Sequence, residues 1–580
     1  MSKKNYLNDS YTQYKNKVGL TIGGKYLKQR NEVSLVWPFK DCILEGGQSS
    51  EEQKRDEIFF NEILAQDEIT QLLESKVLTN PKVINIHGEH NFSSFKRDSE
   101  LNQKRGLPEN TITDNLIFKG NNLLTLHSLK KEFLGKIKLI YIDPPYNTGG
   151  SGDTFTYNNT FKRSSWLTFM KNRLEIAKLL LRKNGVIIAA IDDYEHHTLR
   201  TLMDEIFGGE NRLGTVVGVH NPRGRNDDKY FATMHEYMLV YAKNIELVKL
   251  KNFKFSEKDL KQFNKQDDIS NYAETPYMRT GNNSNKHERP NLYYPIYYNT
   301  VTDKLSLNST EGSVEILPIN NNGEEKTWRW GKKTFETKCD TELLVKKVKG
   351  HYKIYKKRRA SDIQGRKPRT VWYDSKYDAS SNGIMLLRSL LGRSEFSYPK
   401  SLYAVIDIIK ILSDDKDIIL DFFAGSGTTA HAVLQLKEDN EGERQFILCE
   451  QMNYVETVTS KRVQKVIEQN NSGSFVYLEL KKYNQFFIDQ IEDAKDTETL
   501  LSTLELMKDR SFLYYNLDII KQHERIEEFK ALSLNEQKKH LCEILDKNQL
   551  YVNLSSLHDS DFECTDLEKK VTQDFYQIEG

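Results

Sequence analysis

The sequence predicts an α/β protein built on a doubly wound, mostly parallel sheet. Short apolar segments typical of buried strands alternate with helical segments from about residue 115 to 245, and again from about 400 to 475. Several of these strands end in acidic or glycine-rich sequence, which is where ligands bind in open α/β sheets. These two observations define the expected fold class.

The chain is expected to contain several regions, because 580 residues are too many for one hydrophobic core. The strand–helix alternation stops near residue 245 and resumes near 400, so one α/β domain should contain an inserted module. The expected regions are an N-terminal accessory region, the first half of the α/β domain, the inserted module, the second half and a helical C-terminal region for dimerisation or partner binding: 1–110, 111–248, 249–372, 373–475 and 476–580.

Each element is predicted from a local pattern. Residues 49–75 carry apolar positions three and four apart, which predicts an amphipathic helix in the accessory region. Strands, with turn formers at their ends, are predicted at 116–119, 136–142, 186–191, 236–242, 418–421 and 444–450. Helices between or after them are predicted at 122–129, 160–185, 197–208, 402–412 and 428–436, with Gly185 closing the second.

Overall composition excludes several classes of protein. The 84 basic and 83 acidic residues give a net charge of +1, so only local charge can indicate an anionic partner. Five scattered cysteines without a C-x-x-C pair argue against a zinc site or a disulfide framework. No apolar run approaches the roughly 20 residues that span a bilayer, so we expect a cytoplasmic protein without a membrane partner.

A glycine-rich turn follows the strand that ends at Asp421, in the segment IILDFFAGSGTTAHAV. The glycines would let the backbone approach a ligand, and the acid that ends the next strand would suit a ribose diol. The glycines alone also match the dinucleotide fingerprint G-x-G-x-x-A. However, the Asp421 carboxylate would repel a pyrophosphate and attract the ammonium and sulfonium of S-adenosylmethionine, which favours the methyl donor. The expected cofactor-binding residues are Asp421, Phe423, Ala424, Gly425, Gly427, Thr428 and Glu450.

The segment LIYIDPPYNTGG ends a buried strand in Asp143, Pro144, Pro145 and Tyr146. A D-P-P-Y sequence alone can be a simple turn. Together with DFFAGSGTT it resembles the amino-group DNA methyltransferases with D-P-P-Y that modify adenine N6. The order of the two motifs resembles the β class, in which a target-recognition region lies between them, and the inserted module at 249–372 falls there.

Further segments extend the resemblance over most of the chain: GKYLKQRNEVSLVWPFKDCILEGGQ, KGNNLLTLHSLKKEF, PRTVWYDSKYDASSNG and GSFVYLELKKYNQFFIDQIEDAK. They are similar to the modification subunit of type III restriction-modification systems. The resemblance implies an S-adenosylmethionine-dependent enzyme acting on double-stranded DNA, a homodimer, and association with a separate helicase-nuclease restriction subunit. It departs at Asn121, where many relatives carry Asp, so no cofactor role is expected there.

The resemblance and the chemistry of an exocyclic amine imply catalytic roles. The Asp143 carboxylate and the Pro144 carbonyl would accept the two N6 hydrogens, and Pro145 would help restrict the backbone that carries them. Because N6 cannot reach a buried methyl donor from inside a duplex, the adenine would be flipped out and would stack on Tyr146.

Several alternative functions remain open on the sequence. A solitary adenine methyltransferase would have the same chemistry without a restriction partner, and a cytosine-N4 enzyme more often begins its motif with Ser than Asp. Cytosine-C5 methylation needs a cysteine nucleophile, typically after proline, and the chain has no Pro-Cys pair. A nicotinamide dehydrogenase would leave D-P-P-Y unexplained, and a non-catalytic DNA-binding regulator would not need both motifs.

A basic run near the end of the inserted module indicates DNA binding. Residues 346–372 hold eleven Lys or Arg against one acid, with aromatic residues interleaved. We expect phosphate contacts from Lys356, Lys357, Arg358, Arg359 and Arg366.

Two other polar clusters have simpler interpretations. The acids and histidines of AIDDYEHH, residues 189–197, are predicted to cap a helix, so no metal site is expected. His235 and Glu236 are predicted to be solvent-exposed residues at the start of a strand.

Overall fold

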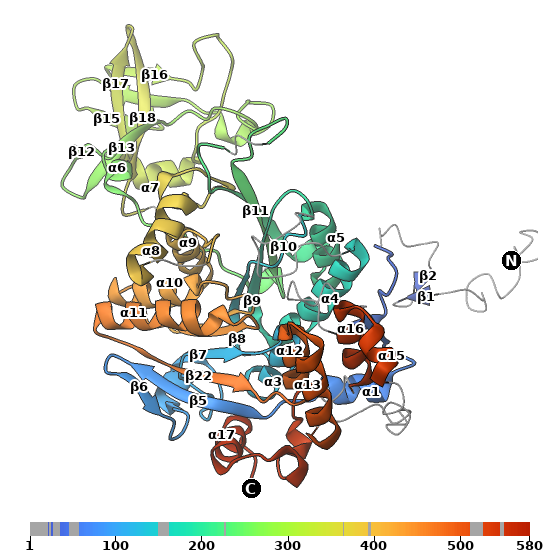
Figure 1. The fold of residues 1–580 in the computed structure, drawn as a ribbon. Coiled ribbons are helices and arrows are strands. Elements are labelled where there is room, and N and C mark those ends of the chain that lie inside the picture. The colour runs from blue at the N-terminus through green and yellow to red at the C-terminus, as the bar shows by residue number, and fades with distance from the viewer. Residues whose placement is uncertain are drawn as a thin grey trace, which may run out of the picture. The chain divides into compact units, whose positions relative to one another are not determined.

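The computed structural model describes residues 21–22, 25–26, 35–45, 57–148, 162–224, 228–362, 365–392, 396–510, 526–545 and 550–579. The chain forms two compact units, one of residues 1–249 with 369–580 and the other of residues 250–368 (Figure 1). The sequence pattern had predicted an inserted module over 249–372.

The first unit is built on an eleven-stranded mixed sheet. Its strand order is β19-β10-β11-β9-β8-β20-β21-β7-β22-β5-β6. The run from β9 to β22 is parallel, whereas β11 and β5 pair antiparallel to their neighbours in that run. The bounds in sheet order are Val371–Trp372, Arg212–Val219, His235–Ala242, Leu181–Ile191, Ile137–Ile142, Ile418–Asp421, Gln445–Glu450, Leu116–Lys119, Ser474–Leu480, Leu78–Asn85 and Gly88–Asn91.

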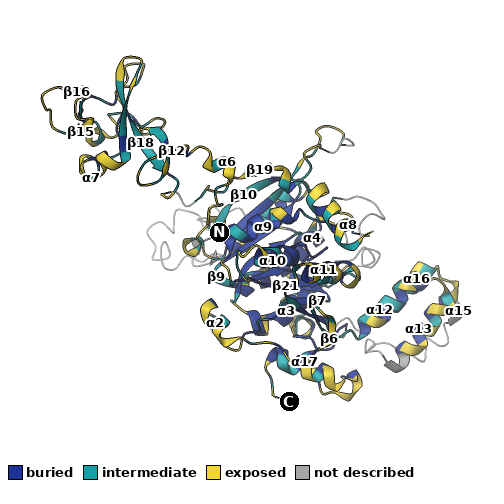
Figure 2. Ribbon diagram, turned by 90° about the vertical axis from the view of Figure 1, so that its left-hand side faces the viewer, coloured by how far each residue is buried: buried dark blue, intermediate teal, exposed yellow. Residues whose placement is uncertain are grey.

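Two groups of helices pack on this sheet, so the predicted doubly wound α/β fold is confirmed. In one group α4 contacts both α3 and α5, and in the other α10 contacts both α9 and α11. All six residues of β8 are buried, because a central strand covered on both faces has no solvent side. Figure 2 shows the middle of the sheet, around β7 and β21, in the colour of buried residues. The helices span Asn122–Phe133 (α3), Arg163–Leu180 (α4), His196–Phe207 (α5), Leu386–Leu391 (α8), Leu402–Leu412 (α9), Thr428–Glu438 (α10) and Lys461–Asn470 (α11).

The predicted amphipathic helix at 49–75 is wrong at residues 58–61 and is confirmed at residues 66–72. β4 (Ile58–Asn61) pairs antiparallel with β3 (Cys42–Glu45), and only α1 (Gln66–Leu72) is helical. Two adjacent phenylalanines favour the strand. The Asn61 carboxamide then accepts hydrogen bonds from the two backbone N–H groups that open the following turn. Residues 49–56 of the prediction lie outside the described residues, while short strands β1 (Thr21–Ile22) and β2 (Lys25–Tyr26) pair earlier in the chain.

The C-terminal region contributes to the core of the first unit. It opens with β22 inside the main sheet, and its last helix, α17, packs against β5. The Phe575 ring contacts those of Phe95, Phe118 and Phe133. Phe118 lies on β7, Phe133 ends α3, and Phe95 lies between β6 and α2. The remaining helices include a group in which α12, α13 and α16 contact one another. Their bounds are Ser99–Arg105 (α2), Asn484–Asp493 (α12), Thr497–Arg510 (α13), Ile526–Ala531 (α15), Leu534–Ile544 (α16) and Asp566–Tyr576 (α17).

The second unit has its own aromatic core, which explains the tyrosine-rich composition of that stretch. Tyr277, Tyr294, Trp328 and Phe335 are buried together between two small antiparallel sheets and a helix. The elements are Glu257–Leu260 (α6), Lys265–Gln266 (β12), Asn271–Pro276 (β13), Ile296–Asn299 (β14), Lys304–Ser306 (β15), Ser313–Ile316 (β16), Lys332–Glu342 (α7), Leu343–Val348 (β17) and His351–Arg359 (β18). Over both units, no helix among the described residues is long and apolar enough to cross a membrane.

Candidate active site

Three adjacent parallel strands bring the predicted acids to one edge of the sheet. β8, β20 and β21 lie side by side, and their carboxyl ends lead to Asp143, Asp421 and Glu450. The two motifs of the sequence, 280 residues apart, therefore meet at the strand ends where α/β sheets bind ligands.

The glycine turn after β20 adopts backbone conformations that suit glycine. Gly425 and Gly427 have φ of 51° and 77°. A Cβ on Gly427 would lie 3.1 Å from Cγ2 of Thr459. The buried Arg462 guanidinium donates to the hydroxyls of Ser426 (2.9 Å) and Thr428 (2.8 Å) from below the turn. Burial lowers the pKa of Arg462 to about 9, so it remains a cation at neutral pH. Arg462, which the sequence patterns did not indicate, thus stabilises the turn through these two hydrogen bonds.

Asp421 and Glu450 are both buried beside this turn. Asp421 accepts hydrogen bonds from the Phe423 backbone N–H (3.1 Å) and the Thr429 hydroxyl (2.6 Å). Burial raises the pKa of Asp421 to about 7, although these two bonds oppose the shift. Glu450 accepts the Gly425 backbone N–H at 2.9 Å, and burial raises its pKa as well. Asp421 is therefore an acid that titrates near neutral pH at the mouth of the glycine turn.

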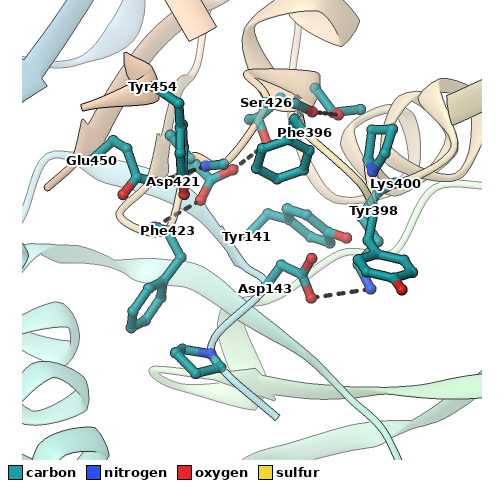
Figure 3. A pocket seen from close by; sticks show the side chains of 16 residues that line it. Tyr141, Asp143, Phe396, Tyr398, Lys400, Asp421, Phe423, Ser426, Glu450 and Tyr454 are labelled. Atoms are coloured by element: carbon teal, nitrogen blue, oxygen red, sulfur yellow. Dashed lines mark hydrogen bonds and ion pairs between the residues drawn. The ribbon is translucent and has the colours of Figure 1, made fainter. Parts of the chain in front are cut away.

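A pocket with an empty volume of about 620 Å³ lies over these strand ends. Figure 3 shows Glu450 and Tyr454 at one side of it and Asp143, Lys400 and Tyr398 at the other. Six of the predicted cofactor residues line it: Asp421, Phe423, Ala424, Gly425, Thr428 and Glu450. The seventh, Gly427, does not line the pocket, and a Cβ on it would face Thr459. Aromatic residues that the sequence did not indicate, among them Phe396 and Tyr454 with rings 5.2 Å apart, complete the wall.

The D-P-P-Y segment is a fixed elbow at the end of β8. The Pro145 carbonyl accepts a hydrogen bond from the buried Trp166 indole N–H at 2.9 Å. Asn147 follows with φ of 54° and donates from its side chain to Glu195 at 3.0 Å. The Pro144 carbonyl accepts no hydrogen bond from the residues that the structure describes. The elbow thus leaves one backbone acceptor open beside the Asp143 carboxylate.

Lys400 and Glu236 join Asp143 and Tyr146 in a half-buried charged network. Lys400 Nζ lies 3.1 Å from Asp143 Oδ1 and contacts both the Glu236 carboxylate and the Tyr146 hydroxyl. The Tyr146 hydroxyl also donates to Glu236 at 3.0 Å. The expectation that Glu236 lies in solvent at the start of its strand is therefore wrong. Its side chain, on the second residue of β11, contacts Lys400 and Tyr146 in the site.

The network sets the protonation states around Asp143. Burial raises the pKa of Asp143, while the Lys400 cation opposes the shift and Glu236 adds to it. Burial acts on Glu236 in the same direction, but Lys400, His220 and Tyr146 together outweigh it and lower the pKa of Glu236. Burial, Asp143 and Glu236 together hold the pKa of Tyr146 well above its usual range, so its hydroxyl stays a donor.

The acids and histidines at 192–197 separate into unrelated contacts. Asp192 accepts a backbone N–H at the start of its own turn, and Asp193 accepts the Tyr237 hydroxyl. Glu195 binds Asn147 and Arg163. Within the described ranges, no group of three or more His, Cys, Asp or Glu side chains could hold a metal ion.

The predicted DNA-contact residues have different surroundings within the second unit. Arg359 is only 2% exposed and forms ion pairs with Asp267 and Glu342, so the structure corrects its expected role to an internal one. Lys357 also pairs with Asp267, at 2.7 Å. The other three predicted residues are half-buried or exposed: Lys356, Arg358 and Arg366.

Comparison with known proteins identifies the family. The family model described as DNA methylase matches residues 137–462, and that of the type III restriction/modification enzyme methylation subunit matches residues 1–20. The chain is 31% identical to the probable type III restriction-modification enzyme HindVI Mod subunit of Haemophilus influenzae, over 99% of this chain and 89% of that protein. It is 32% identical to the EcoPI Mod subunit of Escherichia phage P1, over 63% and 64% of the two chains. It is 33% identical to the type II methyltransferase M.KpnI of Klebsiella pneumoniae, over 60% and 84%. The chain therefore belongs to the DNA methylase family, and within it to the modification subunits of type III restriction-modification enzymes.

Proposed function

We propose that this DNA methyltransferase, with S-adenosylmethionine as methyl donor, methylates N6 of a flipped-out adenine in double-stranded DNA. The observation that supports this most is that Asp143 and Pro145 of the D-P-P-Y elbow line the same pocket as the glycine turn. Acceptors for an amine and a site for a cationic ligand thus lie side by side.

The residues of the pocket fit the methyl donor. Asp421 offers a carboxylate to an ammonium or sulfonium, and Glu450 keeps acceptor capacity for ribose hydroxyls beside its bonds to backbone N–H groups. The rings of Phe396, Phe423 and Tyr454 offer faces to a purine. The chemistry that bound S-adenosylmethionine supplies is an electrophilic methyl group.

The elbow residues act on the target amine. Asp143 and the open Pro144 carbonyl accept the two N6 hydrogens, which aims the nitrogen lone pair toward the cofactor end of the pocket. Tyr146 offers a ring face to the flipped base. Asp143 takes the proton that the methylated amine loses, since its raised pKa makes it a better base than an exposed aspartate. Lys400 neutralises part of the charge of Asp143 and Glu236 and so positions the acceptor.

A transfer assay tests this function directly. Incubation of plasmid DNA with tritium-labelled S-adenosylmethionine should give labelled N6-methyladenine with the wild-type chain and none with Asp143→Ala. Label on cytosine N4 would replace the proposal by the cytosine alternative, and no label from wild type would reject it. Mapping methylated adenines in cells with and without the gene would then give the recognised sequence.

The unit of residues 250–368 is proposed to read the DNA, as the target-recognition domain with expected bounds 249–372. Of the residues expected to contact phosphates, Lys356 and Arg358 are half-buried and Arg366 is exposed, and the charge of Lys357 is partly neutralised by Asp267. Changing Lys356, Arg358 and Arg366 to Gln should weaken binding to all DNA sequences and reduce its salt dependence. Lys338→Gln, an exposed cation on α7, is the matched control. Equal affinity of the triple variant and the control over a range of salt would contradict this assignment.

Partners are proposed at the level of the whole system. As a type III modification subunit, the chain would form a homodimer and join a helicase-nuclease restriction subunit, through the region 476–580. A solitary adenine methyltransferase without a restriction partner is the second candidate. Copurification of a restriction subunit with the tagged chain would decide between them.

A further inference from the structure

The turn between β10 and β11 displays two adjacent aromatic side chains to solvent. Tyr230 is 81% exposed and Phe231 is 90% exposed. Single exposed apolar residues are ordinary on a protein surface. Two further exposed aromatics lie after strand ends on the same edge: Tyr194 (60%) is three residues after β9, and Tyr373 (66%) directly follows β19.

Strand directions place this edge beside the active site. β10, β9 and β19 run parallel to β8, and β11 begins opposite the end of β9, with Tyr237 paired to Ile191. All the turns in question therefore lie at the carboxyl edge that carries Asp143. Phe231 precedes Glu236 by five residues, so the backbone limits their Cα separation to about 18 Å.

The described residues of the turn, 220–224 and 228–234, contact one another. The Asp228 carboxylate accepts the Thr233 backbone N–H at 2.7 Å. Gly224 has φ of 75°, and a Cβ there would lie 2.7 Å from the Cβ of Ala232. At its base, the Met234 carbonyl accepts two backbone N–H groups at 3.1 Å each. The turn thus carries its aromatic pair without covering it.

Cations accompany the exposed rings. Lys229 Nζ lies 5.2 Å from the centroid of the Tyr230 ring, and an Arg369 guanidinium nitrogen lies 3.5 Å from the Tyr373 hydroxyl. Aromatic faces beside Lys and Arg are the combination that binds unstacked bases and their phosphates.

We propose that Phe231, supported by Tyr230, enters the duplex and fills the space that the flipped adenine leaves. The proposal rests on the proposed function, since it needs a base to leave the stack. When the adenine flips out, it loses its base stacking and its base pair. An apolar ring inserted in its place restores part of the stacking. The β10–β11 turn is then the part of the chain that stabilises the opened DNA, and Phe231 is a positioning residue.

The test compares two DNA duplexes that contain the mapped site. In one the target adenine is paired with thymine, and in the other it faces an abasic position, so that little pairing opposes its extrusion. Single-turnover methylation rates are measured for wild type, Phe231→Ala, Phe231→Trp and Leu64→Ala. Leu64, on the turn before α1, is a matched exposed apolar control.

Phe231→Ala should methylate the paired duplex about tenfold or more slowly than wild type, the size of a lost stacking contact. It should recover to within about twofold on the abasic duplex. Phe231→Trp and Leu64→Ala should stay near wild type on both. An unchanged rate of Phe231→Ala on paired DNA, or an equal loss of rate on both duplexes, would overturn the proposed insertion of Phe231 into the duplex. If wild type methylates neither duplex, the proposed function fails instead.

Discussion

Binding of the methyl donor should strengthen as pH rises through neutrality, because Asp421 must lose its proton to attract a cation. With a pKa of about 7, Asp421 is about one-tenth ionised at pH 6 and about nine-tenths ionised at pH 8. An apparent dissociation constant scales inversely with the competent fraction, so affinity should rise about tenfold between these pH values.

Isothermal titration of S-adenosylmethionine across this range measures the effect. Asp421→Asn keeps the shape and an acceptor for the Phe423 backbone N–H, and should bind more weakly with little pH dependence. Asp143→Asn should keep the rise in affinity but move it to lower pH, because the charge of Asp143 contributes to the raised pKa of Asp421. Affinity that is constant or falls as pH rises would refute this account of Asp421.

Three other predictions follow from the contacts. Gly427→Ala should weaken methyl-donor binding and destabilise the fold by about 1–2 kcal/mol, because an L side chain is strained at this positive φ; Gly214→Ala, which has open space around it, is the control, and equal denaturation midpoints would contradict the strain. Lys400→Met should shift the acid limb of the pH–rate profile upward, because the lost cation opposes the raised pKa of Asp143, and an unshifted limb would remove Lys400 from that role. Arg359→Met should lower the thermal stability of the second unit by breaking two internal ion pairs; loss of DNA affinity at unchanged stability would restore its expected DNA contact.

The sequence was most informative where the pattern is local. An apolar strand followed by Asp143 or by the glycine turn predicts its own conformation, because burial, proline and positive φ act within a few residues. The same local reasoning failed at residues 58–61, where pairing with β3 determines a strand inside a helical pattern. Local patterns also did not indicate that Phe575, in the helical C-terminal region, packs against Phe118 of the main sheet.

The residues missed in the site share one physical cause. Lys400 lies 257 residues after Asp143, and Glu236 lies 93 after it, so their meeting depends on strand order and direction. Arg359 shows the reverse case: a basic run suggests a phosphate contact, but the acids that neutralise this member come from other elements.

By itself, the sequence determined the fold class, the two motifs and the family resemblance, because these depend on periodicity and on short segments with their own stereochemistry. Only the tertiary structure decided which charges are paired, which acid titrates near pH 7 and which aromatic rings face solvent. Burial and pairing are set by neighbours distant in the chain, and the energy of a charge depends on those neighbours far more than on its own residue type.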